Sequence, residues 1–359
     1  MKTPRFYILA INPGSTSTKV AVFADDAPLC VNNIRHTVKE LAQFAQLSDQ
    51  HLFRKQLIAQ WLRTNGLPER FDAIIGRGGL IKPIAGGVYE VNEALLHDTR
   101  HAVRQHACNL GCLLAYELAQ EQREPCPAFI ADPVMVDEML PEAHVSGSPL
   151  MPRHAIWHAL NQRAIARRHA HQVGKRYEQL NLIVCHLGGG ISVAAHQGGC
   201  AIDVNNALDG DGPFTPERSG SLPATDLIRL CFSGRHTEAE LIRNVTGRSG
   251  LMAHLGTTDI PHILQRIEQG DSHAKLLIDA MTYHTAKSIA AESAVLCGHI
   301  DAILLTGGMA QSSYITEAIK RRVSHLAPVF VYPGEDEMEA LALNALGVLR
   351  GEMVAKVYE

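Results

Sequence analysis

Two short apolar runs joined by a loop of small and hydroxyl residues open the chain. Residues 6–23 read FYILAINPGSTSTKVAVF, and residues 182–196 repeat the arrangement as LIVCHLGGGISVAAH. Apolar runs of this length, bounded by glycine, proline or serine, are typical of β-strands. Each segment therefore predicts a strand, a tight turn and a second strand. The repetition predicts two related halves.

Two further apolar runs end at loops that carry a charged residue. They are FDAIIGRGGL at residues 71–80, with Arg77, and CPAFIADPVMVDEM at residues 126–139, with Asp132. Open α/β sheets bind ligands outside the carboxyl ends of their strands, so both side chains are expected to face one crevice. An exposed charge at the end of a strand is the alternative interpretation of Arg77.

Helices are predicted between these strands. Apolar residues recur every three or four positions over residues 91–120, with a break expected near Gly111, and over residues 275–297, where Tyr283 is expected to pack in the core. Residues 301–322 predict a strand, a glycine turn and a helix that begins at a serine. Strands alternating with helices predict an α/β fold.

Composition adds limits to this pattern. A length of 359 residues favours two domains, at roughly 150 residues per domain. The net charge of −4 comes from interspersed acids and bases, so neither nucleic acid nor an anionic membrane is an expected partner, and no apolar run is long enough to span a membrane. Eight cysteines without a CxxC pair are typical of reduced thiols in a cytoplasmic protein.

The first loop carries the residues of a phosphate-binding turn. A Walker loop, GxxxxGK[ST], leads from a strand into a helix, whereas Lys19 is followed by the apolar run Val20–Phe23. The Walker interpretation therefore fails on context. Two histidine pairs, at 97 and 101 and at 154 and 158, have helical spacing but no visible third ligand, so a zinc site is not favoured.

The ordered set of loops resembles the acetokinase family, within the acetate and sugar kinase, heat-shock 70 and actin superfamily, over the whole chain. The acetate kinases of that family typically have NSGSSSLK where this chain has NPGSTSTK, and FD[TS]AFH where it has ADPVMVDEM, so the butyrate branch is favoured. The matching segments are INPGSTSTK (11–19), GRGG (76–79), ADPVMVDEM (131–139), RHAIWHALNQRAIAR (153–167), HLGGGIS (186–192), FTPERSG (214–220), LLTGGMAQ (304–311) and PGEDEMEALAL (333–343).

The resemblance implies a fold and a division of the chain. The fold would be two related domains of the actin-like ATPase, or ribonuclease H-like, type with a nucleotide cleft between them. The first domain would comprise residues 1–155 together with a C-terminal helix within 340–359. The second, nucleotide-binding domain would comprise residues 156–339.

The resemblance also implies an activity. The expected reaction transfers the γ-phosphoryl group of ATP to a short-chain fatty acid, butyrate above all, and is reversible. Acetate, propionate and isobutyrate are alternative acceptors, and an actin-like or chaperone-like ATPase is an alternative of another class. Expected partners are ATP or ADP, Mg²⁺, the acid or its acyl phosphate, and further copies of the chain in a homodimer or higher homo-oligomer.

Phosphoryl transfer passes through a loose transition state whose oxygens must be neutralised and aligned. By resemblance, Arg77 and Arg218 bind the transferring group or the carboxylate, and His158 and His186 hydrogen-bond the phosphoryl oxygens. Asp132 organises the metal and the attacking carboxylate. Solvated loop charges and a satisfied structural histidine are the alternatives for Arg218 and His186.

The remaining site residues also follow from the resemblance. Mg²⁺ is expected at Asn12, Asp132 and Glu337, and a solvated acidic helix start is the alternative for the acids at 335–339. For Lys19, a solvent-facing strand residue is the alternative. The residues expected to bind ATP or its phosphates are Asn12, Ser15, Ser17, Lys19, Gly188, Gly189, Gly190, Gly307 and Gly308.

Overall fold

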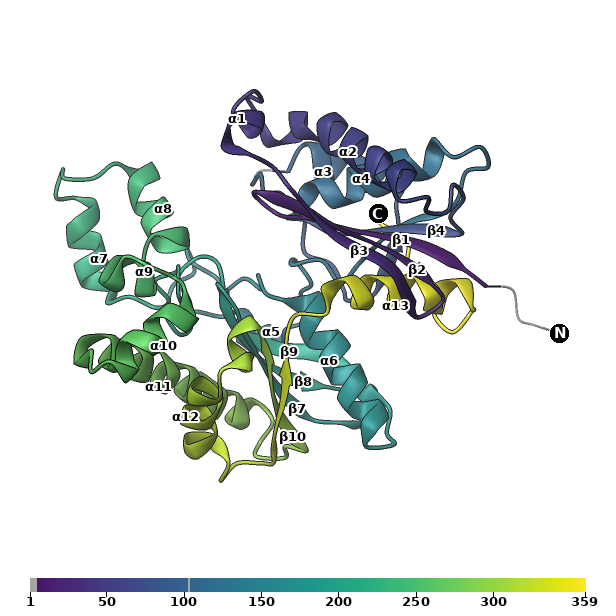
Figure 1. Ribbon diagram of the computed structural model, residues 1–359. Helices are drawn as coiled ribbons and strands as arrows, with labels where there is room; N and C mark the ends of the chain where they lie inside the picture. Colours follow the sequence, from purple (N-terminus) through teal and green to yellow (C-terminus); the bar gives the residue numbers. More distant parts are fainter. Residues whose placement is uncertain (1–4, 103) are drawn as a thin grey trace. The chain divides into compact units, whose positions relative to one another are not determined.

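The chain separates into two compact units in the computed structural model, which describes residues 5–102 and 104–359 (Figure 1). The first unit is Met1–Val136 with Asp336–Glu359, and the second is Asp137–Glu335. Each unit is built around one sheet with helices packed against it, so the predicted α/β class is confirmed.

The sheet of the first unit has the strand order β3-β2-β1-β4-β6-β5. The predicted opening hairpin is present, because β1 pairs with β2 in antiparallel fashion, and β1, β4 and β6 run parallel. The helices α4 and α13 cover opposite faces of these parallel strands, so both faces of the sheet are buried there (Figure 1). The strands are β1 (Tyr7–Pro13), β2 (Ser17–Ala24), β3 (Ala27–Arg35), β4 (Ala73–Arg77), β5 (Val88–Glu90) and β6 (Ala128–Ala131).

Gly111 lies inside a helix and not at a break. A Cβ atom on Gly111 would lie 2.3 Å from the backbone oxygen of Arg77, so the glycine lets α4 approach β4 closely. The predicted break is present but lies before Gly111, between the end of α3 at Arg100 and the start of α4 at Asn109. The helices of the first unit are α1 (Val38–Leu41), η1 (Leu47–Gln50), α2 (His51–Thr64), α3 (Glu93–Arg100), α4 (Asn109–Gln120) and α13 (Glu337–Leu349).

The sheet of the second unit has the order β11-β10-β7-β8-β9. Its buried residues alternate between two cores: Ile183 and Cys185 face the core that contains α11, whereas Leu182 and Val184 face the core that contains α6. Both faces of β7 are thus covered, which accounts for its continuous apolar run. The strands are β7 (Leu182–Leu187), β8 (Ile191–Gln197), β9 (Cys200–Val204), β10 (Ala302–Gly307) and β11 (Val329–Pro333).

The predicted helices of the second unit are present. The side chain of Ser312 accepts a hydrogen bond from the Ile315 amide and caps α12. Tyr283, which was expected in the core, is 43% exposed. No helix among the described residues is both long and apolar enough to cross a membrane. The helices are α5 (Pro141–His144), α6 (Ala159–Gln172), η2 (Tyr177–Gln179), α7 (Ala224–Cys231), α8 (Glu238–Gly247), α9 (Gly250–Leu255), α10 (Ile260–Glu268), α11 (Ser272–Val295), η3 (Gly308–Gln311) and α12 (Ser313–Val323).

The segment 137–155 packs with the second unit, although residues up to 155 were expected in the first. The Leu140 amide donates to the Ile202 carbonyl at 2.9 Å, and the Arg153 guanidinium lies 2.9 Å from the Asp203 carboxylate. These polar contacts tie the segment to β9. The chain returns to the first unit at Asp336 and not at residue 340.

Candidate active site

Three predicted site residues lie at adjacent strand ends in the first unit. Ile11 of β1 pairs with Gly76 of β4, and Arg77 pairs with Ala131 of β6. Asn12, Arg77 and Asp132 therefore occupy neighbouring positions along one edge of the parallel strands. This edge is where α/β sheets bind ligands.

Glu337 joins this edge from α13. Its carboxylate accepts a hydrogen bond from Asn12 Nδ2, and its Oε1 lies 3.0 Å from the Arg77 guanidinium. The Glu337 side chain is only 8% exposed. A buried carboxylate needs such partners, since an unpaired charge at this depth would cost several kcal/mol. Glu337, one of the acids at 335–339, thus contacts both Asn12 and Arg77.

Asp132 is held in an unusual backbone conformation. Its φ is 38°, in the left-handed region, and its side chain is 1% exposed. Asp132 Oδ1 accepts from the Gly87 amide at 2.8 Å, and the Asp132 amide donates to the Gly87 carbonyl at 3.0 Å. Strain of this kind persists only where the surroundings enforce it, and it concentrates at functional sites.

The donor atoms at this edge suit a hard cation. Asn12, Asp132 and Glu337 offer amide and carboxylate oxygens, which Mg²⁺ prefers. Among the described residues, no group of three or more histidine, cysteine, aspartate or glutamate side chains is arranged to hold a metal. A cation at this edge would therefore depend on two carboxylates, the Asn12 amide and other oxygens.

The turn between β1 and β2 is tied to α2 by a buried arginine. The Arg54 side chain is 0% exposed, and its Nη1 donates to the carbonyls of Gly14 (2.8 Å) and Ser17 (3.1 Å). Ser15 is exposed, and so is Lys19, which lies opposite Asn12 in the ladder and therefore on the same face of the sheet.

Sequence analysis missed Arg54. Burial lowers the pKa of Arg54 to about 10, so the guanidinium remains charged at neutral pH. The signal was present in the sequence: Arg54 shares the buried face of α2 with Ile58 and Trp61, at helical spacing. A cation on an apolar helix face indicates a specific acceptor, here the carbonyls of the β1–β2 turn.

Arg218 lies against the glycine turn of the second unit. Thr215 Oγ1 donates to the Gly189 carbonyl at 2.5 Å, and the Thr215 amide donates to the Arg218 carbonyl at 3.0 Å. The Arg218 guanidinium donates to the Ala207 carbonyl at 2.6 Å. A Cβ atom on Gly190 would lie 2.0 Å from Arg218 Nη1, so the glycine creates the space for the guanidinium.

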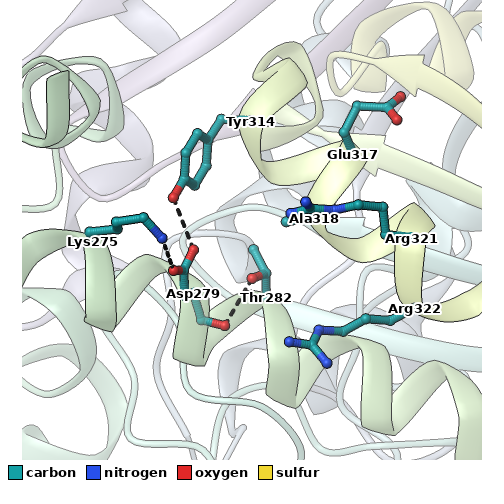
Figure 2. A pocket seen from close by; sticks show the side chains of 8 residues that line it. All are labelled: Lys275, Asp279, Thr282, Tyr314, Glu317, Ala318, Arg321 and Arg322. Carbon is teal, nitrogen blue, oxygen red and sulfur yellow. Dashed lines mark hydrogen bonds and ion pairs between the residues drawn. The ribbon is translucent and has the colours of Figure 1, made fainter.

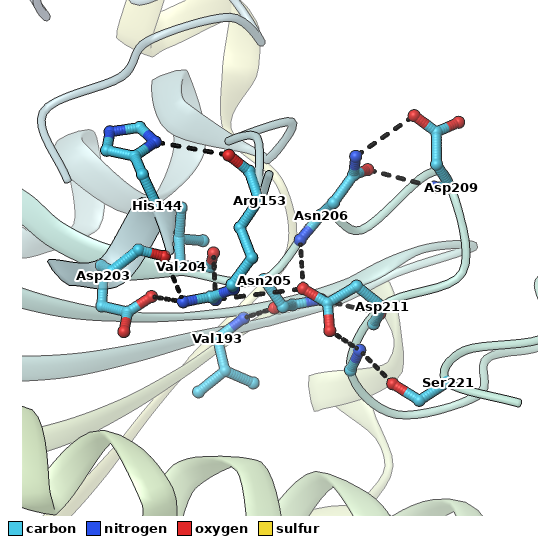
Figure 3. Close-up of polar contacts among 12 residues, drawn as sticks. His144, Arg153, Val193, Asp203, Val204, Asn205, Asn206, Asp209, Asp211 and Ser221 are labelled. Atoms are coloured by element: carbon cyan, nitrogen blue, oxygen red, sulfur yellow. Dashed lines mark hydrogen bonds and ion pairs between the residues drawn. The ribbon is translucent and has the colours of Figure 1, made fainter. Parts of the chain in front are cut away.

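A polar scaffold anchors the loop that carries Arg218 (Figure 3). Asn205 accepts from the Val193 amide at 2.7 Å and donates to the Asp211 carbonyl at 3.2 Å. The Asp211 carboxylate accepts from two loop amides and lies 4.0 Å from the Arg153 guanidinium. This scaffold, which sequence analysis did not identify, joins the loop to β8 and to the segment before α6.

His158 and His186 are stacked. Their ring centroids are 3.8 Å apart, and the ring planes differ by 10°. His158 precedes the first residue of α6, and His186 lies near the end of β7. The structure thus brings together two histidines that lie 28 positions apart in the sequence.

Hydrogen bonds assign the tautomer of His186. Asn161 Nδ2 donates to the Glu335 carbonyl at 2.7 Å, which turns Asn161 Oδ1 toward His186 Nδ1, also at 2.7 Å. An amide oxygen only accepts, so His186 carries a hydrogen on Nδ1. Its Nε2 is then an acceptor in the neutral ring.

The tautomer of His158 is the opposite one. Ser192 Oγ accepts from Gln162 Nε2 at 2.8 Å and from the His158 amide at 3.4 Å, which occupies both of its lone pairs, so its own hydrogen is donated to His158 Nδ1 at 2.9 Å. His158 therefore carries its hydrogen on Nε2. One ring of the stacked pair has an Nε2 donor and the other an Nε2 acceptor, which suits contacts with a group that gains or loses a proton.

A cavity of about 860 Å³ lies beside the glycine turn, within the second unit. Gly188, Gly189 and Gly308 line it, whereas Gly307, at φ 92°, packs against the Leu187 backbone. Within the described chain, no lysine, arginine or histidine lines this cavity. Its lining includes the acids Glu217, Asp259, Glu268 and Glu335 and the apolar residues Leu264 and Met309.

This lining fits the neutral end of a nucleotide. Carboxylates accept hydrogen bonds from hydroxyl and amino groups, and the apolar residues suit a flat ring. Phosphates would be repelled by the acids and would be better accommodated at the glycine turn and Arg218.

Comparison with known proteins places the chain in a family. Residues 151–330 match the acetokinase family. A Bacteroides thetaiotaomicron protein named "Probable butyrate kinase" is 61% identical over 98% of this chain and 99% of its own length. "Butyrate kinase 2" of Clostridium acetobutylicum is 48% identical over 99% of this chain and 100% of its own length.

The chain belongs to the acetokinase family. Acetate kinase from Porphyromonas gingivalis shares its fold, with a TM-score of 0.79 and 18% identity over 96% of this chain and 100% of that one. Propionate kinase from Francisella tularensis gives a TM-score of 0.73 and 18% identity over 94% of this chain and 98% of that one. The predicted fold class is confirmed by these acetokinase-family structures.

Proposed function

We propose that this acetokinase-family enzyme transfers the γ-phosphoryl group of ATP to the carboxylate of butyrate, and that it also catalyses the reverse reaction. The observation that carries the proposal is the second unit's cavity, which borders the glycine turn against which Arg218 lies. Its lining, as far as the structure describes the chain, contains acids and no basic side chain. The two relatives named butyrate kinase support the choice of acid.

The nucleotide is bound by the second unit. Its base and ribose occupy the cavity of about 860 Å³, where Glu268 and Glu335 accept hydrogen bonds from amino and hydroxyl groups. The phosphates extend toward Gly188, Gly189 and Gly190. Gly308 lines the cavity near the nucleoside, and Gly307 packs against the Leu187 backbone at the start of the glycine turn.

Two arginines neutralise the transferring phosphoryl group. Arg218 and Arg77 each present a planar guanidinium that matches phosphoryl or carboxylate oxygens. His158 donates from Nε2 to a phosphoryl oxygen, and His186 donates from Nε2 when its ring is protonated, since phosphoryl oxygens only accept. No covalent intermediate is needed, because alignment and charge neutralisation account for such a transfer.

The edge of the first sheet holds Mg²⁺ and the phosphates. Asn12, Asp132 and Glu337 supply the oxygen ligands, directly or through water, and the bound Mg²⁺ would neutralise charge on the nucleotide phosphates. Ser15 lies in the turn between β1 and β2, and Ser17 and Lys19 lie at the start of β2. Lys19, exposed on the face that Asn12 shares, contacts a phosphate oxygen.

The acid is the least restricted part of the proposal. One methylene changes binding in an apolar pocket by about 1–3 kcal/mol, so acetate, propionate or isobutyrate are competing acceptors. We further propose that the enzyme acts as a homodimer or higher homo-oligomer in the cytoplasm. The buried Cys108, Cys112 and Cys185 are free thiols, which supports a reducing compartment.

An assay with hydroxylamine tests the reaction. The protein is incubated with ATP, Mg²⁺ and each acid, and hydroxylamine traps any acyl phosphate as a hydroxamate. We expect hydroxamate formation that depends on the acid. Continued ATP hydrolysis without hydroxamate from any acid would instead indicate an actin-like or chaperone-like ATPase and contradict the proposal.

A further inference from the structure

A second cavity, of about 790 Å³, lies between α11 and α12 in the second unit (Figure 2). It is separate from the glycine turn, and its basic residues distinguish it from the nucleotide cavity. Figure 2 shows the Arg321 and Arg322 side chains directed from α12 toward α11. Its lining residues are Lys275, Asp279, Thr282, Tyr314, Glu317, Ala318, Arg321 and Arg322.

The acids of this cavity already have partners. Asp279 forms an ion pair with Lys275 and accepts a hydrogen bond from the Tyr314 hydroxyl at 2.9 Å. The Glu317 carboxylate lies 3.4 Å from Lys320, which is outside the lining. Because Lys275 and Asp279 neutralise each other, Arg321 and Arg322 face a single remaining acid, Glu317, and the lining carries a net positive charge.

The arginines have no carboxylate partner among the described residues. The Arg322 guanidinium lies 5.0 Å from the centre of the Tyr283 ring, a cation–π contact that orients it. This contact also gives a role to Tyr283, which is too exposed to belong to the hydrophobic core. Consecutive guanidinium groups beside a cavity of this size can bind an anion with several oxygens.

We propose that this cavity binds a small phosphorylated molecule, and that its occupancy changes the affinity of the enzyme for ATP. Arg321 and Arg322 bind the phosphate, and the Thr282 hydroxyl and Ala318 lie beside the rest of the molecule. Tyr314 lines both this cavity and the nucleotide cavity. Binding that disturbs the hydrogen bond from Tyr314 to Asp279 therefore alters the nucleotide cavity. This link to ATP affinity rests on the proposed function.

Calorimetric titration with pyrophosphate tests the binding, with the nucleotide cavity saturated by ADP and free Mg²⁺ held constant. The double variant Arg321→Gln/Arg322→Gln should bind at least about tenfold more weakly than the wild type, because two charged hydrogen-bond donors are lost. The control Lys320→Gln removes a neighbouring charge outside the cavity and should bind within about threefold of the wild type.

Three results would overturn the proposed site: no saturable binding to the wild-type protein, an equal loss in Lys320→Gln, or binding of malonate as tight as that of pyrophosphate. The last would indicate a general anion site. None of these results depends on which acid is phosphorylated, so they are distinct from a failure of the proposed function.

Kinetics test the link to the nucleotide. Pyrophosphate should change the KM for ATP in the wild type and in Lys320→Gln, and this change should disappear in the double variant. A change that persists in the double variant arises from competition in the nucleotide cavity and would overturn the link. An unchanged KM in the wild type would overturn it as well.

Discussion

At the scale of single residues, each proposed catalytic side chain is fixed by a partner. Arg77 is paired with Glu337, Arg218 is bonded to Ala207, and the ring nitrogens of His186 are assigned by Asn161. A group held in place before the substrate binds loses little conformational freedom in the transition state. These residues should therefore affect turnover more than the binding of ATP.

Substitution of either arginine tests this expectation. Arg77→Ala and Arg218→Ala should each lower kcat by about thirtyfold or more, equivalent to about 2 kcal/mol in the barrier, with ATP binding largely retained. Steady-state kinetics and an ADP titration measure the two effects. Arg229→Ala, at an exposed arginine of the second unit, is the control. Near-normal turnover of Arg77→Ala or Arg218→Ala would show that the substituted arginine has no part in the mechanism.

Glu292 predicts a pH dependence of stability. Burial and the nearby Asp203 carboxylate raise its pKa to about 8, against about 4.5 in the unfolded chain. Between these values the folded protein holds a proton that the unfolded chain releases, so this group lowers stability as pH rises through the interval. Arg153 offsets only part of the cost.

Glu292→Gln should remove this dependence. Relative to the wild type, the variant should gain stability from pH 4.5 to pH 8, by on the order of 4 kcal/mol in total, and the difference should then level off. Urea unfolding across this range measures it. The exposed Glu124→Gln is the control. A difference that is constant with pH would show that Glu292 does not hold a raised pKa.

At the scale of elements, Arg54 connects α2 with the phosphate loop between β1 and β2. Arg54→Met keeps the length of the side chain but leaves the Gly14 and Ser17 carbonyls without their donor. Unfolding stability should fall by about 2–4 kcal/mol, and kcat should fall with it. Arg63→Met, at an exposed position of the same helix, should change neither. An unchanged kcat in Arg54→Met would show that the loop does not depend on Arg54.

Sequence patterns predicted the elements better than the contacts between them. Alternating and continuous apolar runs were sufficient for β1, β2, β7 and β8, because burial sets those patterns. The role of Gly111 was not predicted, because it is a close approach to β4, a contact far along the chain. The boundary near residue 136 was missed because the segment that follows is anchored by polar contacts to β9.

The candidate site shows the same division. Asn12, Arg77 and Asp132 could be predicted because strand ends mark the binding edge of a sheet. Asn161, Thr215 and Asp211 could not, because their role is to orient other residues. Such roles depend on hydrogen-bond geometry, which no periodicity in the sequence records.

At the scale of the whole molecule, the proposal gives the two units separate tasks. The proposed nucleotide cavity belongs to the second unit, and the proposed metal edge belongs to the first. A change at the metal edge should therefore leave binding of metal-free ADP intact.

Glu337→Gln tests this separation. The variant should need about 10–100-fold more Mg²⁺ for half-maximal activity, with unchanged affinity for ADP in the presence of a chelator. Glu339→Gln, two positions further along the same helix, is the control. Weaker ADP binding without metal would contradict the division of tasks.

The most direct test of the central claim is the ratio of kcat/KM for butyrate to that for acetate, measured as hydroxamate formation at saturating ATP and Mg²⁺. Two additional methylenes in an apolar pocket predict a ratio of at least about ten in favour of butyrate. A ratio below one would contradict the proposal that butyrate is the preferred acid.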